Sequence, residues 1–473
     1  MNTKNTRRHF LKTAGPAILL APSAVSLIGC SSAKPTANKT ENTDTKTAVR
    51  SSNIILNVTT FGAKADGITK DTLAFQQAID RCSVLGGGEV LVPAGNYLTG
   101  AIELRSNTFL RLEKDAVILG SPDFADYPVS QVRWEGKWIK GYVALIYAFH
   151  ADNCGILGPG KIAGNHALGG RPNAQNPLRH PALIEPIGCT NLRFEDFSTD
   201  YYLMWSIHPT YCQHMVFQNL TIRSSGGNGD GIDIDSCKHV RIMNCDIASG
   251  DDCISLKSGR GMEGYSLLYT TEDVHISNCT FSDSIFACIG IGSETSGGIR
   301  DVRIEKCKFI KAKTHAVYIK SRPGRGAFIE NIFVDDIDVS GTEGGFLRFN
   351  ILASGLQDQD PVPGDEGIPT IKNFHFSNIR VKDVPLLVDG TGIHPNKPLD
   401  GFSLTNISGT CAKGISLANI KNAKLANINI TGYAGPLLSI HNVTGSGLSG
   451  AVNIDQPKIQ EAVPVPAQPY QLH

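Results

Sequence analysis

Lys238-His-Val-Arg-Ile-Met-Asn-Cys245 is the stretch that decides the fold, because near copies of it recur along the chain. In each copy apolar residues alternate with polar ones, so every second side chain would point inward from a strand. The copies are 23 to 42 residues apart, and a repeat of this length with insertions of varied size is typical of a solenoid. They begin at Thr190, Gln213, Lys238, Glu272, Arg300, Glu330 and Lys372.

These repeats predict an all-β protein, a single-stranded right-handed parallel β-helix (a β-solenoid) whose coils stack on one another. An antiparallel sandwich would not repeat so regularly at this period. Asp71–Cys82 is the one good helical pattern, and it would form an N-terminal capping helix over the open first coil. Strand patterns continue to about Ile430, so we expect one β-helix domain over residues 51–455 and a Pro-rich tail over 456–473.

The first 50 residues are predicted to form an export signal followed by a flexible tether. Arg7-Arg8 precedes an apolar stretch that is too short to span a bilayer comfortably, and this order resembles a twin-arginine export signal. Leu27-Ile-Gly-Cys30 closes the stretch and resembles a bacterial lipobox, in which Cys30 carries the lipid. Residues 1–30 are therefore predicted to be a lipoprotein signal, with an ordinary cleaved signal as the alternative, and residues 31–50 a disordered tether. The predicted location is periplasmic, with any membrane contact made through the lipid anchor.

The composition limits the partners. Lys+Arg and Asp+Glu number 44 each, so no global field would draw the chain to nucleic acid or to a membrane surface. An acidic ligand would need a local basic cluster. Several of the 12 cysteines recur at one place in the repeat, which favours stacked buried thiols over disulfides. We expect a monomer.

A second register in the same coils brings carboxylates together. Asp230-Gly-Ile-Asp-Ile-Asp235 aligns with Asp252-Cys-Ile-Ser-Leu-Lys257, and then with the segments that begin at Ala287 and His315. Equivalent residues on successive coils lie roughly 4.8 Å apart, so Asp230 should lie beside Asp252, with Asp251 next to both. Carboxylates this close repel one another, and at least one should hold a proton near neutral pH. A proton donor beside a proton acceptor is the minimum for cleaving an acetal.

The alignment also supplies basic and polar neighbours. Arg322 and Arg325 follow Lys320 in a short loop and would complete a basic patch two coils from the carboxylates. Such a patch suits the carboxylate of a uronic acid. One predicted column contains His208, Asp235, Lys257, Gly292 and Lys320, and another contains Asp233, Ser255, Gly290 and Tyr318.

Structural roles compete with these functional ones. Asp-Asp pairs are common in turns, and solenoids stack Asp and Asn in ladders. For Asp233 and Asp235 a structural role is favoured, with Asp235 paired to Lys257. His208 would equally be a packed histidine near Trp205. The loop that contains Arg322 and Arg325, taken alone, would be a solvated turn.

At these residues the chain resembles glycoside hydrolase family 28, the polygalacturonases and their relatives, over nearly all of the sequence after the tether. The resemblance implies that Asp251 is the general acid and that Asp230 and Asp252 activate water, with inversion at the anomeric carbon. The motifs that carry it are Asn228-Gly-Asp230, Gly250-Asp-Asp252 and Tyr318-Ile-Lys320, with Trp205-Ser-Ile-His-Pro209 similar to exo-acting bacterial members. The expected substrate-binding residues are Asn228, Lys320, Tyr318, His315, His208, Arg322 and Lys257.

The chain departs from the family pattern at two positions. The family has Gly-His-Gly on the coil after the aspartate pair, whereas this chain has Phe286-Ala287-Cys288. His315 stands in the same column one coil later and would partly replace the missing histidine. The Arg-Ile-Lys motif, which binds the sugar carboxylate, reads Tyr318-Ile-Lys320, so only the lysine remains. The three aspartates of the family, Asp230, Asp251 and Asp252 (the hydrolytic trio), are therefore present, whereas the residues expected to bind the sugar are altered.

The expected function is hydrolysis of glycosidic bonds in an acidic, pectin-like polysaccharide or oligosaccharide, without a metal or cofactor. The main alternative keeps the trio but has a pocket respecialised for another sugar, such as rhamnose or an algal galactose. A polysaccharide lyase would instead need a calcium site or a Lys or Arg base beside a uronate. A non-catalytic β-helix that only binds glycan is the remaining alternative.

Overall fold

The structure, a computed structural model, describes residues 54–173, 175–200 and 202–459. The predictions for the export signal, for lipidation at Cys30, for the tether and for residues 460–473 of the tail lie outside this part of the chain. Within it, no helix is both long enough and apolar enough to cross a membrane.

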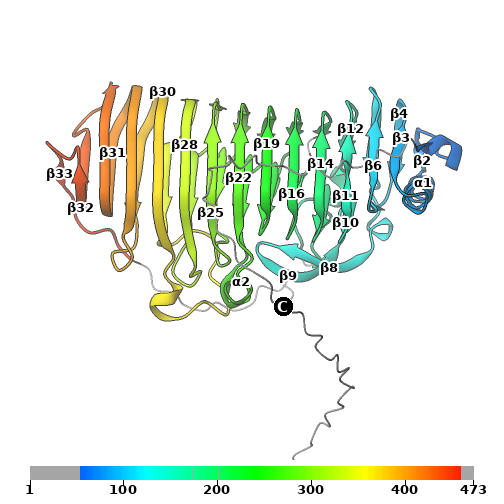
Figure 1. The fold of residues 1–473 in the computed structure, drawn as a ribbon, viewed down its shortest axis with the longest axis horizontal. Helices are drawn as coiled ribbons and strands as arrows, with labels where there is room; N and C mark the ends of the chain where they lie inside the picture. The colour runs from blue at the N-terminus through cyan, green and yellow to red at the C-terminus, as the bar shows by residue number, and fades with distance from the viewer. Residues whose placement is uncertain (1–53, 174, 201, 460–473) are drawn as a thin grey trace, which may run out of the picture. The chain divides into compact units, whose positions relative to one another are not determined.

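The described chain winds into coils, each made of short strands that pair in parallel with the strands of the next coil (Figure 1). The strands form three stacks, here called sheets 1, 2 and 3. This arrangement confirms the predicted all-β, right-handed parallel β-helix. Because every coil hydrogen-bonds to its neighbours, the solenoid satisfies its backbone groups without long-range crossovers.

Sheet 1 includes the two strands that follow the carboxylate motifs. Its strands are β5 (Ile102–Glu103), β10 (Ile146–Phe149), β13 (Ile184–Ile187), β18 (Ile232–Asp235), β21 (Ile254–Lys257), β24 (Ile289–Ile291), β27 (His315–Lys320) and β29 (Gly345–Asn350). Ile207 pairs with Ile184 of β13 on one side and with Ile232 of β18 on the other, so it connects β5, β10 and β13 with the later strands of sheet 1.

Sheets 2 and 3 complete the coils. Sheet 2 contains β1 (Ile55–Asn57), β3 (Gly88–Val92), β6 (Thr108–Leu112), β11 (Asp152–Leu157), β14 (Thr190–Glu195), β16 (Gln213–Gln218), β19 (Lys238–Met243), β22 (Thr271–Ser277) and β25 (Ile299–Glu305). Sheet 3 contains β2 (Asp66–Lys70), β4 (Gly95–Thr99), β7 (Ala116–Gly120), β12 (Lys161–Ala163), β15 (Ser198–Asp200), β17 (Thr221–Arg223), β20 (Asp246–Ser249), β23 (Thr280–Ser284) and β26 (Lys308–Phe309). Later strands run on around the corners: β28 (Phe328–Ser340), β30 (Thr370–Gly392), β31 (Leu399–Thr431), β32 (Leu438–Ser446) and β33 (Val452–Asn453).

The predicted repeat register is confirmed in sheet 2. Met215 pairs with Leu192 on one side and Val240 on the other, and Val274 continues the column. Asn219 and Asn244, near the ends of the repeats, adopt φ of 56° and 55°, a left-handed conformation that asparagine tolerates well. Their amides form a ladder, since the Asn244 amide donates to the Asn219 carbonyl oxygen at 3.3 Å.

The cysteines are stacked as expected. All 11 cysteines in the described part are free and buried. Cys189, Cys212 and Cys237 illustrate the stacking, because the backbone N–H of each of the first two donates to the sulfur of the next at 3.3 Å. These thiols fill the core as small apolar groups.

A helix covers the first coil. The α-helix α1 (Thr72–Val84) agrees with the predicted capping segment Asp71–Cys82, with Asp71 at its N-cap position, and it buries Phe75 and Ile79 against the coil. The other short helices lie in insertions: η1 (Val58–Phe61), η2 (Phe124–Asp126), η3 (His166–Leu168), α2 (Gly261–Leu267) and η4 (Gly364–Gly367).

Insertions between strands build walls beside sheet 1. The strands β8 (Val129–Trp134) and β9 (Lys137–Tyr142) form an antiparallel hairpin. Its turn comes so close to the coils that a Cβ on Gly136 would lie 3.0 Å from side-chain atoms of Arg260 and Glu294. The hairpin, α2 and the loop that follows β29 all lie along the same side of the solenoid (Figure 1).

Candidate active site

Three carboxyl groups meet where β18 and β21 begin. Ile232 pairs with Ile254, so Asp230 and Asp252 precede neighbouring strands at equivalent positions. One oxygen of each of Asp230, Asp251 and Asp252 lies within 4.8 Å of the others. The predicted clustering of the trio is therefore confirmed.

The trio opens into a polar pocket of about 170 Å³. Acidic and basic groups are present in equal number, and the floor includes Trp205 and Ser255. The charged lining residues are Glu135, Asp230, Asp251, Asp252 and Glu294 with Arg171, Lys257, Arg260, Lys320 and Arg325. A pocket of this size and polarity suits one sugar ring better than an apolar ligand.

Protonation differs among the carboxyl groups. Burial, followed by the charges of Asp230 and Asp252, raises the pKa of Asp251 to about 8. Burial also raises the pKa of Asp252, but the Lys320 ammonium opposes this shift. Asp251 therefore keeps a proton at neutral pH, whereas Asp252 loses its proton more readily. The pair combines a proton donor with a proton acceptor.

Two lysines reach the carboxyl groups from other positions on sheet 1. The Lys257 ammonium lies 3.3 Å from Asp230 and 2.6 Å from Asp233. The Lys320 ammonium lies 2.5 Å from Asp252. Both lysines are almost fully buried, so these contacts are little weakened by solvent.

Two further hydrogen bonds and one glycine fix the position of the Asp252 carboxyl group. The Ser255 hydroxyl donates to it at 2.9 Å, and the backbone N–H of Ala287 donates at 3.2 Å. Gly290 leaves the space through which Lys320 reaches it. A Cβ at this position would lie 2.2 Å from Oδ2 of Asp252 and 2.9 Å from Nζ of Lys320.

Ala287 and His315 lie at positions equivalent to Asp252 on the next two coils, as predicted. Ala287 contacts Asp252 through its backbone, while His315 lies one coil farther on, with its ring 5.6 Å from that of Tyr318. Burial, followed by the charge of Arg348, lowers the pKa of His315 to about 4, so its ring is neutral. Among the residues lining the pocket His315 is not found, so the expected partial replacement of the missing histidine has no geometric support.

The expected substrate-binding residues divide into two groups. Asn228, Lys257 and Lys320 line the pocket. The side-chain oxygen of Asn228 is buried and has no hydrogen-bond partner in the described part of the chain. Tyr318 lies outside this lining, beneath Arg348, with its ring 5.3 Å from the guanidinium.

The predicted position of His208 was wrong. Ile207 pairs with Ile232, so the strand register pairs His208 with Asp233 and not with Asp235, although its Nε2 lies 4.0 Å from Oδ2 of Asp235. The preceding coil has a different length at this point, which shifts the register by two residues. The His208 ring packs on Trp205 with centroids 4.4 Å apart, and its Nδ1 lies 2.9 Å from the Glu185 carboxylate. It is a buried structural histidine that does not line the pocket.

The predicted Asp235–Lys257 ion pair was also wrong. Asp235 is structural, as favoured, but its partner is Arg133 of the hairpin, at 3.1 Å. Burial alone would raise the pKa of Asp235, but Arg133 and His208 outweigh this effect and lower it. Lys257 is thereby left to contact Asp230 and Asp233.

The two arginines of the loop after Lys320 have different positions. Arg325 lines the pocket, is fully buried and forms an ion pair with Asp358. Arg322, the one expected to bind substrate, donates to the carbonyl oxygen of Gly355 at 2.6 Å and is absent from the lining. The basic patch is thus only partly assembled as predicted.

Several pocket residues could not be predicted from the repeats. Glu135 comes from the hairpin, Arg171 from the loop after η3, and Arg260 and Glu294 from insertions after sheet 1 strands. Glu294 stays ionised although buried, because burial raises its pKa less than Lys257 and nearby arginines lower it. None of these positions repeats from coil to coil, so the sequence carried no periodic signal for them.

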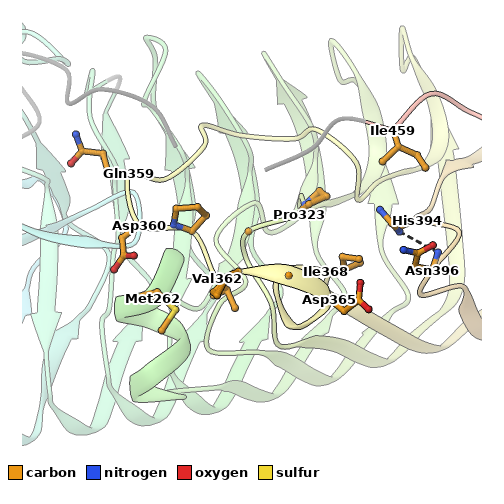
Figure 2. Close-up of a pocket in the computed structure, with 14 residues that line it drawn as sticks. Met262, Pro323, Gln359, Asp360, Val362, Asp365, Ile368, His394, Asn396 and Ile459 are labelled. Atoms are coloured by element: carbon orange, nitrogen blue, oxygen red, sulfur yellow. Dashed lines mark hydrogen bonds between the residues drawn. The ribbon is translucent and has the colours of Figure 1, made fainter. Parts of the chain in front are cut away.

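A larger cavity of about 1090 Å³ lies farther along the solenoid (Figure 2). Pro323, Val362 and Ile368 contribute an apolar wall, and Asp365 and His394 contribute polar groups, with the backbone N–H of Asn396 donating to His394 at 3.2 Å. Unlike the carboxylate pocket, its lining within the described part of the chain does not include a cluster of three carboxyl groups. Size alone therefore does not identify the site of chemistry.

The carboxylate spacing would also suit a divalent cation. However, Lys257 and Lys320 already compensate the charges of Asp230 and Asp252. Asp251 keeps its proton up to a pKa of about 8. This donor set fits proton transfer better than cation binding.

The raised pKa values predict a bell-shaped dependence of kcat/KM on pH. Activity should fall as pH rises through about 8, because Asp251 then loses the proton that it must donate. It should also fall in acid, at a pH above the ordinary value of 3.8, because the raised pKa of Asp252 lets the base become protonated early. A pH–rate profile on a glycoside substrate measures both limbs. Undiminished activity well above pH 8 would contradict the role of Asp251.

Comparison with known proteins agrees with this geometry. The family model for glycosyl hydrolases family 28 matches residues 82–348. A protein named probable polygalacturonase from Vitis vinifera is 31% identical over 362 residues, covering 74% of this chain and 72% of that protein. An exo-poly-alpha-D-galacturonosidase from Dickeya chrysanthemi is 25% identical, covering 86% of this chain and 76% of that protein.

A solved structure supports the fold. The family 28 exopolygalacturonase of Yersinia enterocolitica superposes with a TM-score of 0.67 at 21% sequence identity, covering 82% of this chain and 78% of that one. With the matched family model and the carboxylate trio in place, the chain belongs to glycosyl hydrolases family 28.

Proposed function

We propose that this protein is an exo-acting glycosidase that hydrolyses the terminal glycosidic bond of a galacturonan or related pectic chain. The observation that carries the proposal is the pairing of a protonated Asp251 with the lysine-held Asp252. The five basic residues of the pocket support an acidic sugar, and the relative named exo-poly-alpha-D-galacturonosidase supports galacturonate.

The proposed reaction is a single displacement by water. Asp251 gives its proton to the glycosidic oxygen as the bond to the anomeric carbon breaks. Asp252, assisted by Asp230, takes a proton from the water whose oxygen bonds to that carbon. Close packing of carboxylates is usual for retention, so inversion is supported by the family resemblance and not by the spacing.

Exo action is supported by the walls of the pocket. The hairpin turn places Glu135 in the lining, and Trp134 stacks on Trp205 with ring centroids 5.3 Å apart. These contacts cover the coils on the N-terminal side of the carboxylates. A chain end can enter such a pocket, whereas the middle of a long polymer cannot lie through it.

A second candidate function is hydrolysis of a different terminal sugar. Ala287 and Tyr318 replace the histidine and arginine of the family pattern, and Tyr318 is 5% exposed. Both positions lie beside the pocket and not in its lining, and a site altered in this way would fit rhamnose or an algal galactose unit with the same carboxylate trio.

Product analysis on a panel of pectic and algal polysaccharides tests these functions together. Release of monomeric galacturonic acid is expected. Release of another sugar would favour the second candidate, and unsaturated products that absorb in the ultraviolet would identify a lyase. Binding without turnover on every polysaccharide would contradict both hydrolytic proposals.

We also propose that the protein is exported by the twin-arginine route and anchored by a lipid on Cys30, in the periplasm or at a membrane. The support is the Arg7-Arg8 motif and the Leu27–Cys30 sequence. Cys30→Ala should move the protein from the membrane fraction to the soluble fraction, with Cys82→Ala as a control. If the Cys30 variant sediments with membranes unchanged, the anchor is not at this residue.

A further inference from the structure

A strip of aromatic and cationic side chains continues along sheet 1 beyond the carboxylates. The Phe286 and Tyr318 rings are stacked, with centroids 5.7 Å apart and planes inclined by 25°. The Lys320 ammonium lies 4.8 Å from the Phe286 ring, and the Arg348 guanidinium 5.3 Å from the Tyr318 ring. Since Lys320 also contacts Asp252, the strip runs without a break from the acid–base site to Arg348.

The strip leads out of the pocket where the coils are less covered. On the N-terminal side, the hairpin and its neighbouring loop pack closely on the coils, because the side chains of Arg133 in the hairpin and Arg179 in the loop are only 1% and 0% exposed. The Arg348 side chain, by contrast, is 40% exposed. A glycan whose terminal sugar fills the pocket would therefore extend over Phe286, Tyr318 and Arg348.

Strand register gives the distance along this path. Ser255 pairs with Gly290, Gly290 with Tyr318, and Tyr318 with Arg348. Arg348 thus lies three coils beyond the strand that follows Asp252, roughly 14 Å away at about 4.8 Å per coil. This distance spans more than one pyranose ring, so Arg348 would face the second sugar beyond the bond being cleaved.

We propose that Arg348 binds the carboxylate of the second uronic acid residue beyond the scissile bond, which gives the enzyme its preference for acidic chains of at least three residues. The inference rests on the proposed function. In the described part of the chain, the ion pair of Arg348 is with Asp389, through Nε at 3.4 Å. The terminal amino groups remain for a carboxylate, which a planar guanidinium can bind with two parallel hydrogen bonds.

Tyr318 acts in this arrangement as a support. Its ring lies beneath the guanidinium and orients it, while the Asn350 amide donates to its hydroxyl at 3.4 Å. Stacking on an aromatic face leaves the edge of the guanidinium free for hydrogen bonds. The tyrosine and the arginine would form one subsite built across two coils.

The test compares digalacturonide with trigalacturonide. Arg348→Ala should raise KM for trigalacturonide roughly tenfold, as expected for the loss of one charge-assisted contact at a half-exposed site, and leave digalacturonide unchanged. Arg348→Lys should restore part of the difference. Arg303→Ala is a matched control, because Arg303 lies 5.5 Å from the Phe333 ring and 3.7 Å from Glu305 but belongs to sheet 2.

The outcomes separate this inference from the function on which it rests. If the wild type cleaves both substrates and Arg348→Ala loses activity equally on both, or on neither, the subsite is wrong while the function stands. If the wild type cleaves neither substrate, the proposed function fails and the subsite fails with it.

Discussion

Asp251→Asn should reduce turnover by about 100- to 10,000-fold, the usual effect of losing a general acid. Asparagine has nearly the same shape as the protonated carboxyl group that Asp251 carries at neutral pH, but it has no acidic proton to give to the leaving oxygen. The backbone N–H of Asp252, which donates to the Asp251 carboxyl at 3.0 Å, can donate to the asparagine carbonyl in the same way. Substrate binding should therefore change little, and the loss should appear in kcat. Steady-state kinetics on an oligogalacturonide measure it.

Stability gives an independent check on the same variant. The pKa of Asp251 rises to about 8 on folding, so the folded state binds this proton more tightly than the unfolded state. Below pH 3.8 the group is protonated in both states and has no effect. As pH rises towards 8 it increasingly destabilises the fold. Asn removes this cost, so the variant should unfold at the same temperature as the wild type or higher at neutral pH.

Asp246→Asn serves as the matched control for the acid. Asp246 lies on β20 of the same coil, is half-exposed and pairs with Arg223 at 2.8 Å, outside the pocket. Its substitution should leave kcat near the wild-type value. Comparable kcat for the Asp251 and Asp246 variants would remove Asp251 from the mechanism.

Gly290→Ala is expected to lower activity on the order of 100-fold, although it adds only one methyl group. The methyl carbon would lie 2.2 Å from the Asp252 carboxylate and 2.9 Å from the Lys320 ammonium, so both groups must move. A shift of about 1 Å in a catalytic base is enough for a loss of this size. The atoms it meets are the ends of side chains, so the coil itself should still form.

Gly390→Ala provides the comparison for Gly290. Its added methyl would meet the flexible end of the Leu417 side chain at 2.7 Å, in a coil remote from the carboxylates. Both variants should keep their circular dichroism spectra, and only Gly290→Ala should lose activity. Full activity of Gly290→Ala would mean that the Lys320–Asp252 contact is dispensable.

Lys320 stabilises Asp252 as an ionised base, and the Ala287 N–H adds a hydrogen bond from the coil between them. Both contacts are independent of the side chain at position 287, so they remain available to Asp252 without the histidine of the family pattern.

The sequence by itself determined the solenoid and the carboxylate cluster. Repeats that pair Met215 with Val240 also bring Asp230 beside Asp252, because stacking of equivalent residues fixes position through strand spacing alone. The lining roles of Asn228, Lys257 and Lys320 followed from the same columns and the family motifs. Wherever the coils repeat regularly, position in the sequence translates directly into position in space.

Only the tertiary structure decided the walls, the partners and the protonation. The hairpin that brings Glu135 and Arg133 to sheet 1 is an insertion, and an insertion has no repeat to place it. The two-residue shift of His208 arose for the same reason, since the irregular coil before β18 breaks the period on which the alignment depended. The proton on Asp251 depends on burial and on the sum of surrounding charges, quantities that exist only once groups distant in sequence have come together.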